Sequence, residues 1–143
     1  MDQQLSPHFT LREMVASATA IKYNIDNTPE SEDVICLRTL CEKVLEPLRK
    51  RFGAIHVTSG FRSVELNEKV GGVRSSQHLQ GQAADIYVPN AEVGRKMYLY
   101  VLRNLEFDQM FVERKRLDGS RWIHVSYVSP SRNRYEAHPH WVV

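Results

Sequence analysis

Apolar side chains recur at three- and four-residue steps over residues 31–52, which is the spacing of an amphipathic helix. The stretch ends in Lys50, Arg51 and Gly53, residues that are typical of a helix C-terminus. Pro47 lies inside it and has no backbone N–H to donate. We therefore predict one long helix with a kink or break about one turn before this proline.

Three shorter helices are expected at residues 10–17, 64–69 and 91–105. The first begins with the capping-box pattern, in which the side chains of Thr10 and Glu13 each accept a hydrogen bond from the other's backbone N–H. The third carries its apolar side chains on one side. Each of these helices therefore has one face available to pack on a core.

Four strands are expected, at residues 54–58, 82–88, 107–114 and 121–128. The last two flank Asp118-Gly119, a pair typical of a two-residue hairpin turn. The segment after Pro130 has no periodicity, and we expect it to be irregular. Helices that alternate with short, hairpin-bearing strands predict one α+β domain over residues 1–143.

The composition excludes several classes of protein. Net charge is only +2 in 143 residues, so we expect no nucleic-acid partner. No apolar stretch is long enough for membrane insertion. The opening segment MDQQLSPHFTLREM lacks basic and apolar signal regions, so we expect no export signal and a cytoplasmic location as synthesised, with action at the cell wall only after release. Oligomeric state is not readable.

Candidate metal ligands lie on two separate segments. His78 and Asp85 are separated by six residues, with Gly81 between them to permit a tight turn. Strand alternation puts Trp122, His124 and Ser126 on one face of the last strand. Two histidines and one carboxylate leave a fourth tetrahedral position for water, as in a catalytic zinc site. A strand histidine such as His124 is, however, commonly a hydrogen-bonded core residue, and the His78–Asp85 spacing alone is weak.

Three motifs together resemble the zinc D-Ala-D-Ala carboxypeptidase family. Residues 75–85, SSQHLQGQAAD, resemble its S-x-H-x-x-G-x-A-x-D signature. Residues 58–63, TSGFRS, and 122–126, WIHVS, resemble its S-G-[YF]-R-S and W-x-H-x-S segments. The resemblance covers residues 5–128, and its opening, LSPHFTLREM, is similar to small single-domain bacterial and phage members.

The resemblance implies a fold and a set of roles. The fold would be the hedgehog/DD-peptidase type, an antiparallel sheet with helices packed on one face. One zinc ion would be held by His78, Asp85 and His124, and it would bind the water that attacks the peptide bond. Arg62 would hold the substrate's carbonyl or terminal carboxylate, although a surface salt bridge is the alternative. Apart from the resemblance, Ser76 is a candidate to position the His78 loop or bind substrate, and it could equally be ordinary turn polarity.

Ser126 is a further candidate for the cleft wall, and it could equally be ordinary strand polarity. His138 and His140 look tempting as a second metal pair, but we expect them on the surface of the C-terminal segment.

The general base is where the chain departs from the family pattern. Many members carry an acid three residues before the last histidine ligand, and Arg121 stands there in this chain. A two-residue turn at Asp118-Gly119 would place Glu113 opposite His124, close enough to act as the base. Asp108 is a weaker candidate, and an exposed hairpin glutamate is the alternative reading of Glu113.

Two functions remain open at this point. The first is a zinc metallopeptidase that hydrolyses a peptide bond in peptidoglycan stem peptides, as a D-Ala-D-Ala carboxypeptidase or as an endopeptidase of the endolysin type. The second is a catalytically inactive zinc-binding module that recognises cell-wall or peptide ligands. Arg121 in place of an acid favours the second, whereas Glu113 and Arg62 favour the first.

Overall fold

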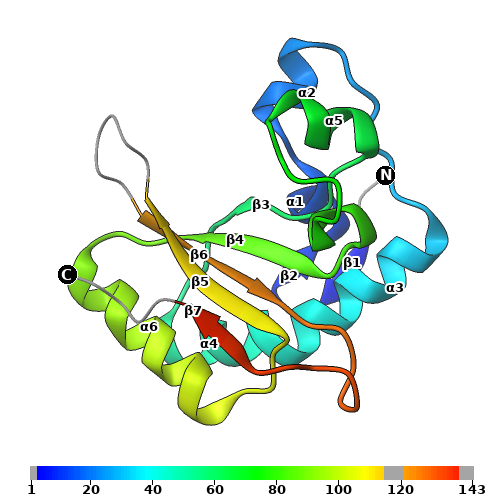
Figure 1. Ribbon diagram of the computed structural model, residues 1–143. Helices are drawn as coiled ribbons and strands as arrows, with labels where there is room; N and C mark the ends of the chain where they lie inside the picture. Colours follow the sequence, from blue (N-terminus) through cyan, green and yellow to red (C-terminus); the bar gives the residue numbers. More distant parts are fainter. Residues whose placement is uncertain (1–2, 115–120, 139–143) are drawn as a thin grey trace.

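The computed structural model describes residues 3–114 and 121–138, and Figure 1 shows them as coloured ribbon. The helices are α1 (Leu11–Val15), α2 (Ala18–Lys22), α3 (Ser31–Leu40), the π-helical η1 (Cys41–Leu45), α4 (Glu46–Phe52), α5 (Val64–Lys69), the 3₁₀-helical η2 (Gln77–Gln80) and α6 (Ala91–Asn104). The strands are β1 (Gln4–Ser6), β2 (Phe9–Thr10), β3 (Val57–Ser59), β4 (Ala83–Tyr87), β5 (Gln109–Arg114), β6 (Arg121–Ser126) and β7 (Glu136–His138). The chain is therefore α+β, as predicted.

The main sheet has five strands in the order β3-β4-β6-β5-β7, and β1 and β2 form a separate two-stranded sheet. Neighbours from β3 to β5 are antiparallel. The last strand, β7, instead runs parallel to β5. The expectation of an irregular segment after Pro130 is therefore wrong over Glu136–His138, which form a strand at the edge of the sheet. A strand of three residues is too short to show an alternating pattern in the sequence.

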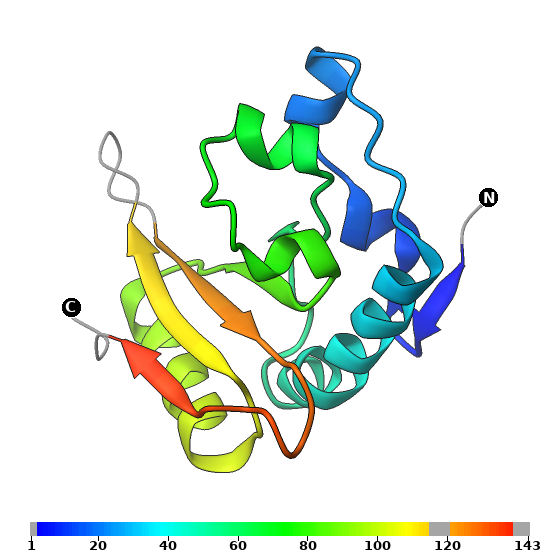
Figure 2. The ribbon, with the colours of Figure 1, turned by 45° about the vertical axis from the view of Figure 1, so that its right-hand side comes forward.

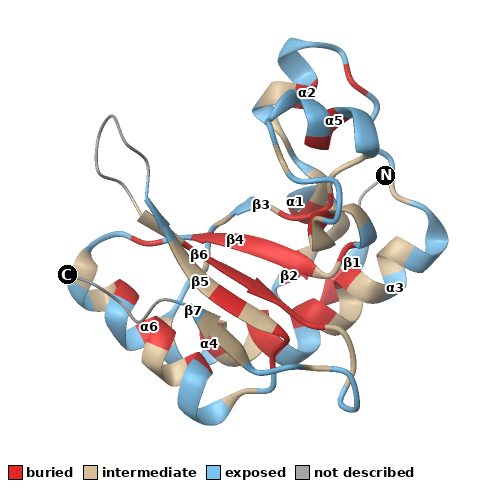
Figure 3. Ribbon diagram, in the orientation of Figure 1, coloured by how far each residue is buried: buried red, intermediate tan, exposed pale blue. Residues whose placement is uncertain are grey.

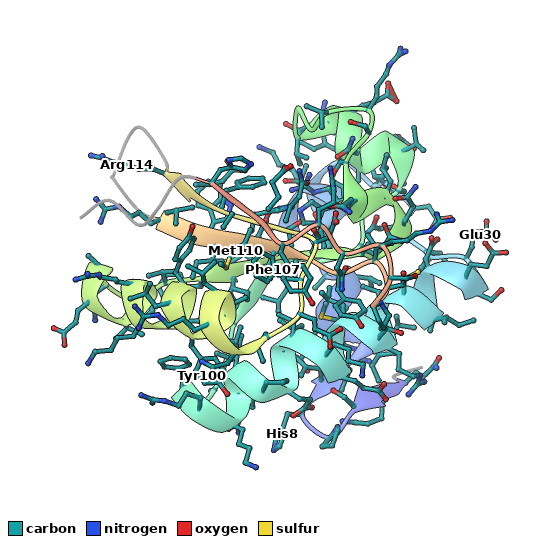
Figure 4. All side chains as sticks on the ribbon, turned by 60° about the horizontal axis from the view of Figure 1, so that its bottom comes forward. His8, Glu30, Tyr100, Phe107, Met110 and Arg114 are labelled. Carbon is teal, nitrogen blue, oxygen red and sulfur yellow. The ribbon has the colours of Figure 1, made fainter. Side chains whose placement is uncertain are left out.

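Helices cover one face of this sheet, as predicted (Figure 1). The strands β4, β5 and β6 turn apolar side chains toward α3, α4 and α6, and Figure 3 shows buried residues along these strands and the helix sides that meet them. The core between them includes Leu40, Val44, Leu48, Ile86, Met97, Val101, Met110, Ile123 and Val125. Burying each such side chain stabilises the fold by about 1.5–3 kcal/mol. Met110 and Phe107, labelled in Figure 4, belong to the same core.

The predicted long helix is confirmed over residues 31–52, with an irregularity one turn before Pro47. The backbone N–H of Glu46 donates to the carbonyl of Cys41, five residues back, so η1 is a π turn. Pro47 cannot donate a backbone hydrogen bond, and the wider turn before it accommodates that loss. Among the helices that the structure describes, none combines the length and apolar character needed to cross a membrane.

Most other expected elements are present with small shifts in their ends. The capping box of α1 is formed by Thr10 and Glu13, and α5 has the predicted bounds. Strand β3 is shorter than expected and lies at Val57–Ser59, and the short helix α2 was not predicted.

The predicted register of the β5–β6 hairpin is wrong by two residues. His124 pairs with Phe111, and Glu113 pairs with Trp122. A shift of two keeps every side chain on its expected face, so Glu113 still shares a face with His124. The Asp118-Gly119 turn from which the register was derived lies outside the described residues.

Candidate metal centre

Two neighbouring strands and a short helix bring His78, Asp85 and His124 together. Asp85 on β4 pairs directly with His124 on β6, so their side chains stand on the same face of the sheet. His78 comes from η2, which precedes β4 and stands beside the face not covered by α4 and α6 (Figure 2). All three residues are buried, and their nearest ligand atoms lie within 4.8 Å of one another. The structure therefore juxtaposes the three residues that the sequence singled out.

The spacing of these atoms suits a tetrahedral ion. Asp85 Oδ1 lies 2.9 Å from His124 Nδ1 and 3.4 Å from His78 Nε2. A tetrahedral metal with bonds of about 2.0 Å keeps its ligand atoms about 3.3 Å apart. The donor set is therefore a His-Asp-His cluster that fits a metal ion without rearrangement of the strands.

His78 is held in one orientation by the backbone around it. Its Nδ1 donates to the carbonyl of Gly60 at 2.6 Å, which leaves the lone pair of Nε2 free for a metal. Its own backbone N–H donates to Ser76 Oγ at 3.2 Å. Gly60 is glycine of necessity, since a Cβ there would lie 2.3 Å from the carbonyl oxygen of Met14. Ser76 Oγ therefore caps η2 at His78.

The carboxylate of Asp85 stays ionised in spite of its burial. Burial alone would raise its pKa, but the adjacent His124 and His78 rings outweigh that effect and hold the pKa well below the ordinary value. One oxygen faces the two histidines, and the other lies 3.4 Å from Arg62 Nη2. Asp85 thus presents a negatively charged oxygen to the point where the histidines converge.

Arg62 lies in the wall of the site and is largely buried, so the surface salt bridge considered above does not describe it. Burial lowers its pKa, and the Asp85 and Glu113 carboxylates oppose that shift. Besides contacting Asp85, its Nε donates to Ser59 Oγ at 3.0 Å and its Nη1 to Asn67 Oδ1 at 3.2 Å. These three bonds leave two of the five guanidinium N–H groups for a ligand.

A cavity of about 450 Å³ opens over the cluster. One wall is the segment before His78, and the other is β5. Its lining is Arg62, Gly71, Gly72, Val73, Ser75, Ser76, Gln77, His78, Asp85, Gln109, Phe111, Glu113 and His124. Glu113 therefore faces the same cavity as the three candidate ligands.

Several other candidates lie away from the cavity. Ser126 does not line it: the residue is completely buried, and its Oγ accepts from the Gln109 backbone N–H at 3.0 Å, so it joins β6 to β5. His138 is exposed and pairs with Glu136, and His140 lies outside the described residues. Asp108 is buried and bonded to Arg134, which makes it a structural carboxylate and not a free base.

Sequence reasoning missed about half of the cavity wall, including one aromatic and two glutamine side chains. Phe111 stacks on the His124 ring, and Gln77 and Gln109 stand on opposite walls. Alternation from Glu113 would have placed Phe111 and Gln109 on the cavity face, because the three positions are two residues apart. No local signal distinguishes Gln77, whose partners lie far along the chain.

Comparison with protein families gives one match that covers most of the chain. A family model described as Peptidase M15 matches residues 7–126, which include all three candidate ligands, Arg62 and Glu113. No curated protein matches the chain.

Proposed function

The chain belongs to the peptidase M15 family, and on that premise we propose that it is a zinc metallopeptidase that hydrolyses a peptide bond in peptidoglycan stem peptides. The observation that carries the proposal is the buried cluster of His78, Asp85 and His124 at the floor of an open cavity. A peptidase needs a metal site that its peptide substrate can reach, and the cavity would give that access.

The ion would be held by Nε2 of His78, Oδ1 of Asp85 and Nδ1 of His124. When bound there, zinc would lower the pKa of the attacking water and polarise the scissile carbonyl. The protein's own contribution is rigidity. Gly60 fixes the ring of His78, Phe111 stacks on His124, and Arg62 contacts the outer oxygen of Asp85. Removing such an outer contact typically lowers metal affinity or activity by about 10- to 100-fold.

Glu113 is the residue we propose as general base. It shares the cavity with the cluster and lies diagonally across the β5–β6 ladder from His124. Diagonal neighbours are about 7–8 Å apart at the backbone, within reach of a glutamate side chain through one water. From this position its carboxylate would take a proton from the attacking water and deliver it to the leaving amine.

Arg62 is proposed to bind the substrate. Its two remaining N–H groups suit the carbonyl beside the scissile bond or a terminal carboxylate. The cavity wall is otherwise largely neutral or acidic among the described residues, so a substrate oxygen would find its positive partner here. Ser76 is close enough to the same cavity to line it, while its Oγ is already engaged by the His78 backbone.

The test is a mass-spectrometric assay of the zinc-loaded protein on purified stem peptides and on cell-wall sacculi. We expect a new amine and a new carboxylate at one bond. Two pentapeptides, one with a free C-terminal D-Ala-D-Ala and one with an amidated C-terminus, distinguish the two kinds of peptidase. A carboxypeptidase requires the free acid, whereas an endopeptidase cleaves both at an internal bond.

The alternative is a module that binds zinc and a cell-wall ligand without hydrolysing it, favoured by Arg121 at the position where many members carry an acid. No hydrolysis of any of these substrates between pH 6 and pH 9, with zinc confirmed bound, would support this alternative over the peptidase.

A further inference from the structure

Asp108 is a buried carboxylate immediately before β5, and four donors surround it. Arg134 forms a fork, with Nε 2.9 Å from Oδ1 and Nη2 2.7 Å from Oδ2. The backbone N–H of Arg134 also donates to Oδ1 at 3.0 Å, and Gln77 Nε2 donates to Oδ2 at 2.8 Å. A carboxylate has about four lone-pair positions, so these donors leave none for a substrate proton. Asp108 therefore serves its neighbours and not the reaction directly.

One of those neighbours adjoins the metal cluster. Gln77 precedes His78 in η2, and its backbone carbonyl accepts from the N–H of Gln82 at 3.0 Å. Its side chain is held by Asp108 at the same time. The turn that carries His78 is thus held both by a backbone hydrogen bond from Gln82 and by the carboxylate of Asp108, just before β5.

The last strand, β7, also contacts the cavity wall formed by β5. Glu136 accepts from Gln109 Nε2 at 2.7 Å, and Gln109 lines the cavity. Arg134 therefore contacts Asp108, the residue before β5, and Glu136 contacts Gln109, the first residue of β5. The parallel pairing of β7 with β5 keeps these contacts in register.

We propose that Asp108 and Arg134 are positioning residues of the metal centre, which fix the His78 turn through the side chain of Gln77. The inference rests on the proposed metal site, but it concerns residues that touch neither metal nor substrate. Both oxygens of the buried Asp108 carboxylate are hydrogen-bonded, so Gln77 and Arg134 are held at one fixed point, and removing either donor weakens that restraint. The segment around residue 134 is then part of the site's architecture, although it lies beyond the matched residues 7–126.

The experiment measures zinc affinity by chelator competition in four variants of the full chain. Arg134→Met removes the fork from a side chain that is 54% exposed, so the fold should tolerate it. Gln77→Met removes the link to Asp108 while keeping the side-chain length. Arg132→Met is the matched control, two positions away and exposed. The fourth variant combines Arg134→Met with Gln77→Met.

We expect Arg134→Met and Gln77→Met each to weaken zinc binding about tenfold or more, as is typical for outer contacts of a metal ligand. The double variant should be no weaker than the weaker single variant, because both changes act on one connection. Arg132→Met should bind zinc as the parent does. Circular dichroism and thermal unfolding of the metal-free proteins show whether each variant is folded.

Zinc affinity within twofold of the parent in both folded single variants would overturn the proposal, even if their melting temperatures fall, since that pattern describes a purely structural ion pair. Additive losses in the double variant would overturn the connection through Gln77. A parent chain that binds no zinc would instead refute the metal centre itself, so failure of the inference and failure of the proposed function are distinguishable.

Discussion

Phe111 lies directly across the β5–β6 ladder from His124, and the two rings stack with centroids 4.4 Å apart and planes inclined by 15°. The His124 ring also makes an edge-to-face contact with the His78 ring, with centroids 5.1 Å apart and planes inclined by 72°. Contacts with two rings restrict the rotation of the His124 imidazole, so its Nδ1 remains directed at Asp85. The ring contacts of Phe111 and His78 thus help to fix the orientation of His124 in the metal site.

Replacing Phe111 with leucine should destabilise the protein and loosen the metal site. The aromatic contact is worth about 1 kcal/mol beyond the area it buries. We expect the free energy of unfolding to fall by about that amount in urea denaturation. Phe111→Tyr is the control, because it keeps the ring. Equal stability of the leucine and tyrosine variants would contradict a role for the stack.

Glu113→Gln should abolish turnover and leave zinc in place. Glutamine has nearly the same shape but cannot accept a proton from water, and a general base contributes about 10²- to 10⁴-fold. We expect the catalytic rate constant to fall by at least about 100-fold, while the zinc content stays at one ion per chain. Glu65→Gln, an exposed change on α5, is the control. Full activity in Glu113→Gln would eliminate this residue as the base.

Gly60→Ala should be more harmful than alanine at Gly71, a glycine of the cavity wall. The new Cβ would lie 2.3 Å from the Met14 carbonyl oxygen, a backbone atom that cannot move aside cheaply. Overpacking of this kind costs about 1–3 kcal/mol, and here it also displaces the carbonyl that holds His78. Gly71→Ala is the comparison: it has free space and a φ of +77°, so we expect about 1 kcal/mol and unchanged zinc affinity. Thermal unfolding and chelator competition measure both effects.

Stability should fall at low pH partly through Asp108. The Arg134 hydrogen bonds outweigh burial and lower the pKa of Asp108 from 3.8 to about 2. A pKa that is lower in the folded state stabilises the fold above the ordinary pKa, and the contribution disappears as pH falls from about 4 to 2. It amounts to at most about 2.5 kcal/mol. Metal-free parent protein should therefore lose more stability between pH 5 and pH 2.5 than Arg134→Met does, and equal losses would contradict the assignment.

Much of the fold was predictable because its signals are local. The apolar period over residues 31–52 identified the long helix, and Pro47 located its irregular turn. The β5–β6 register was not predictable in the same way. It was derived from Asp118-Gly119 as a two-residue turn, yet Phe111 and not Glu113 pairs with His124. Strand alternation alone fixes the face of a residue and leaves shifts of two open.

The site was predictable where residues contact one another through a recognisable motif, and not where partners are distant in sequence. His78, Asp85 and His124 were identified as a set, and the structure brings them together. Asp108 considered by itself suggests a weak candidate base. Only its contact with Arg134, 26 residues away, makes clear that it is an enclosed structural carboxylate. The short strand β7 depends on similarly distant contacts, and no periodic pattern in the sequence indicates it.

The most direct test of the central claim is hydrolysis of a stem peptide by metal-free protein titrated with zinc, alongside the same titration of Asp85→Ala. The account predicts that activity of the parent rises linearly and stops at one zinc per chain, while Asp85→Ala neither retains zinc nor cleaves. Hydrolysis without added metal in the presence of a chelator, or full activity in Asp85→Ala, would contradict it.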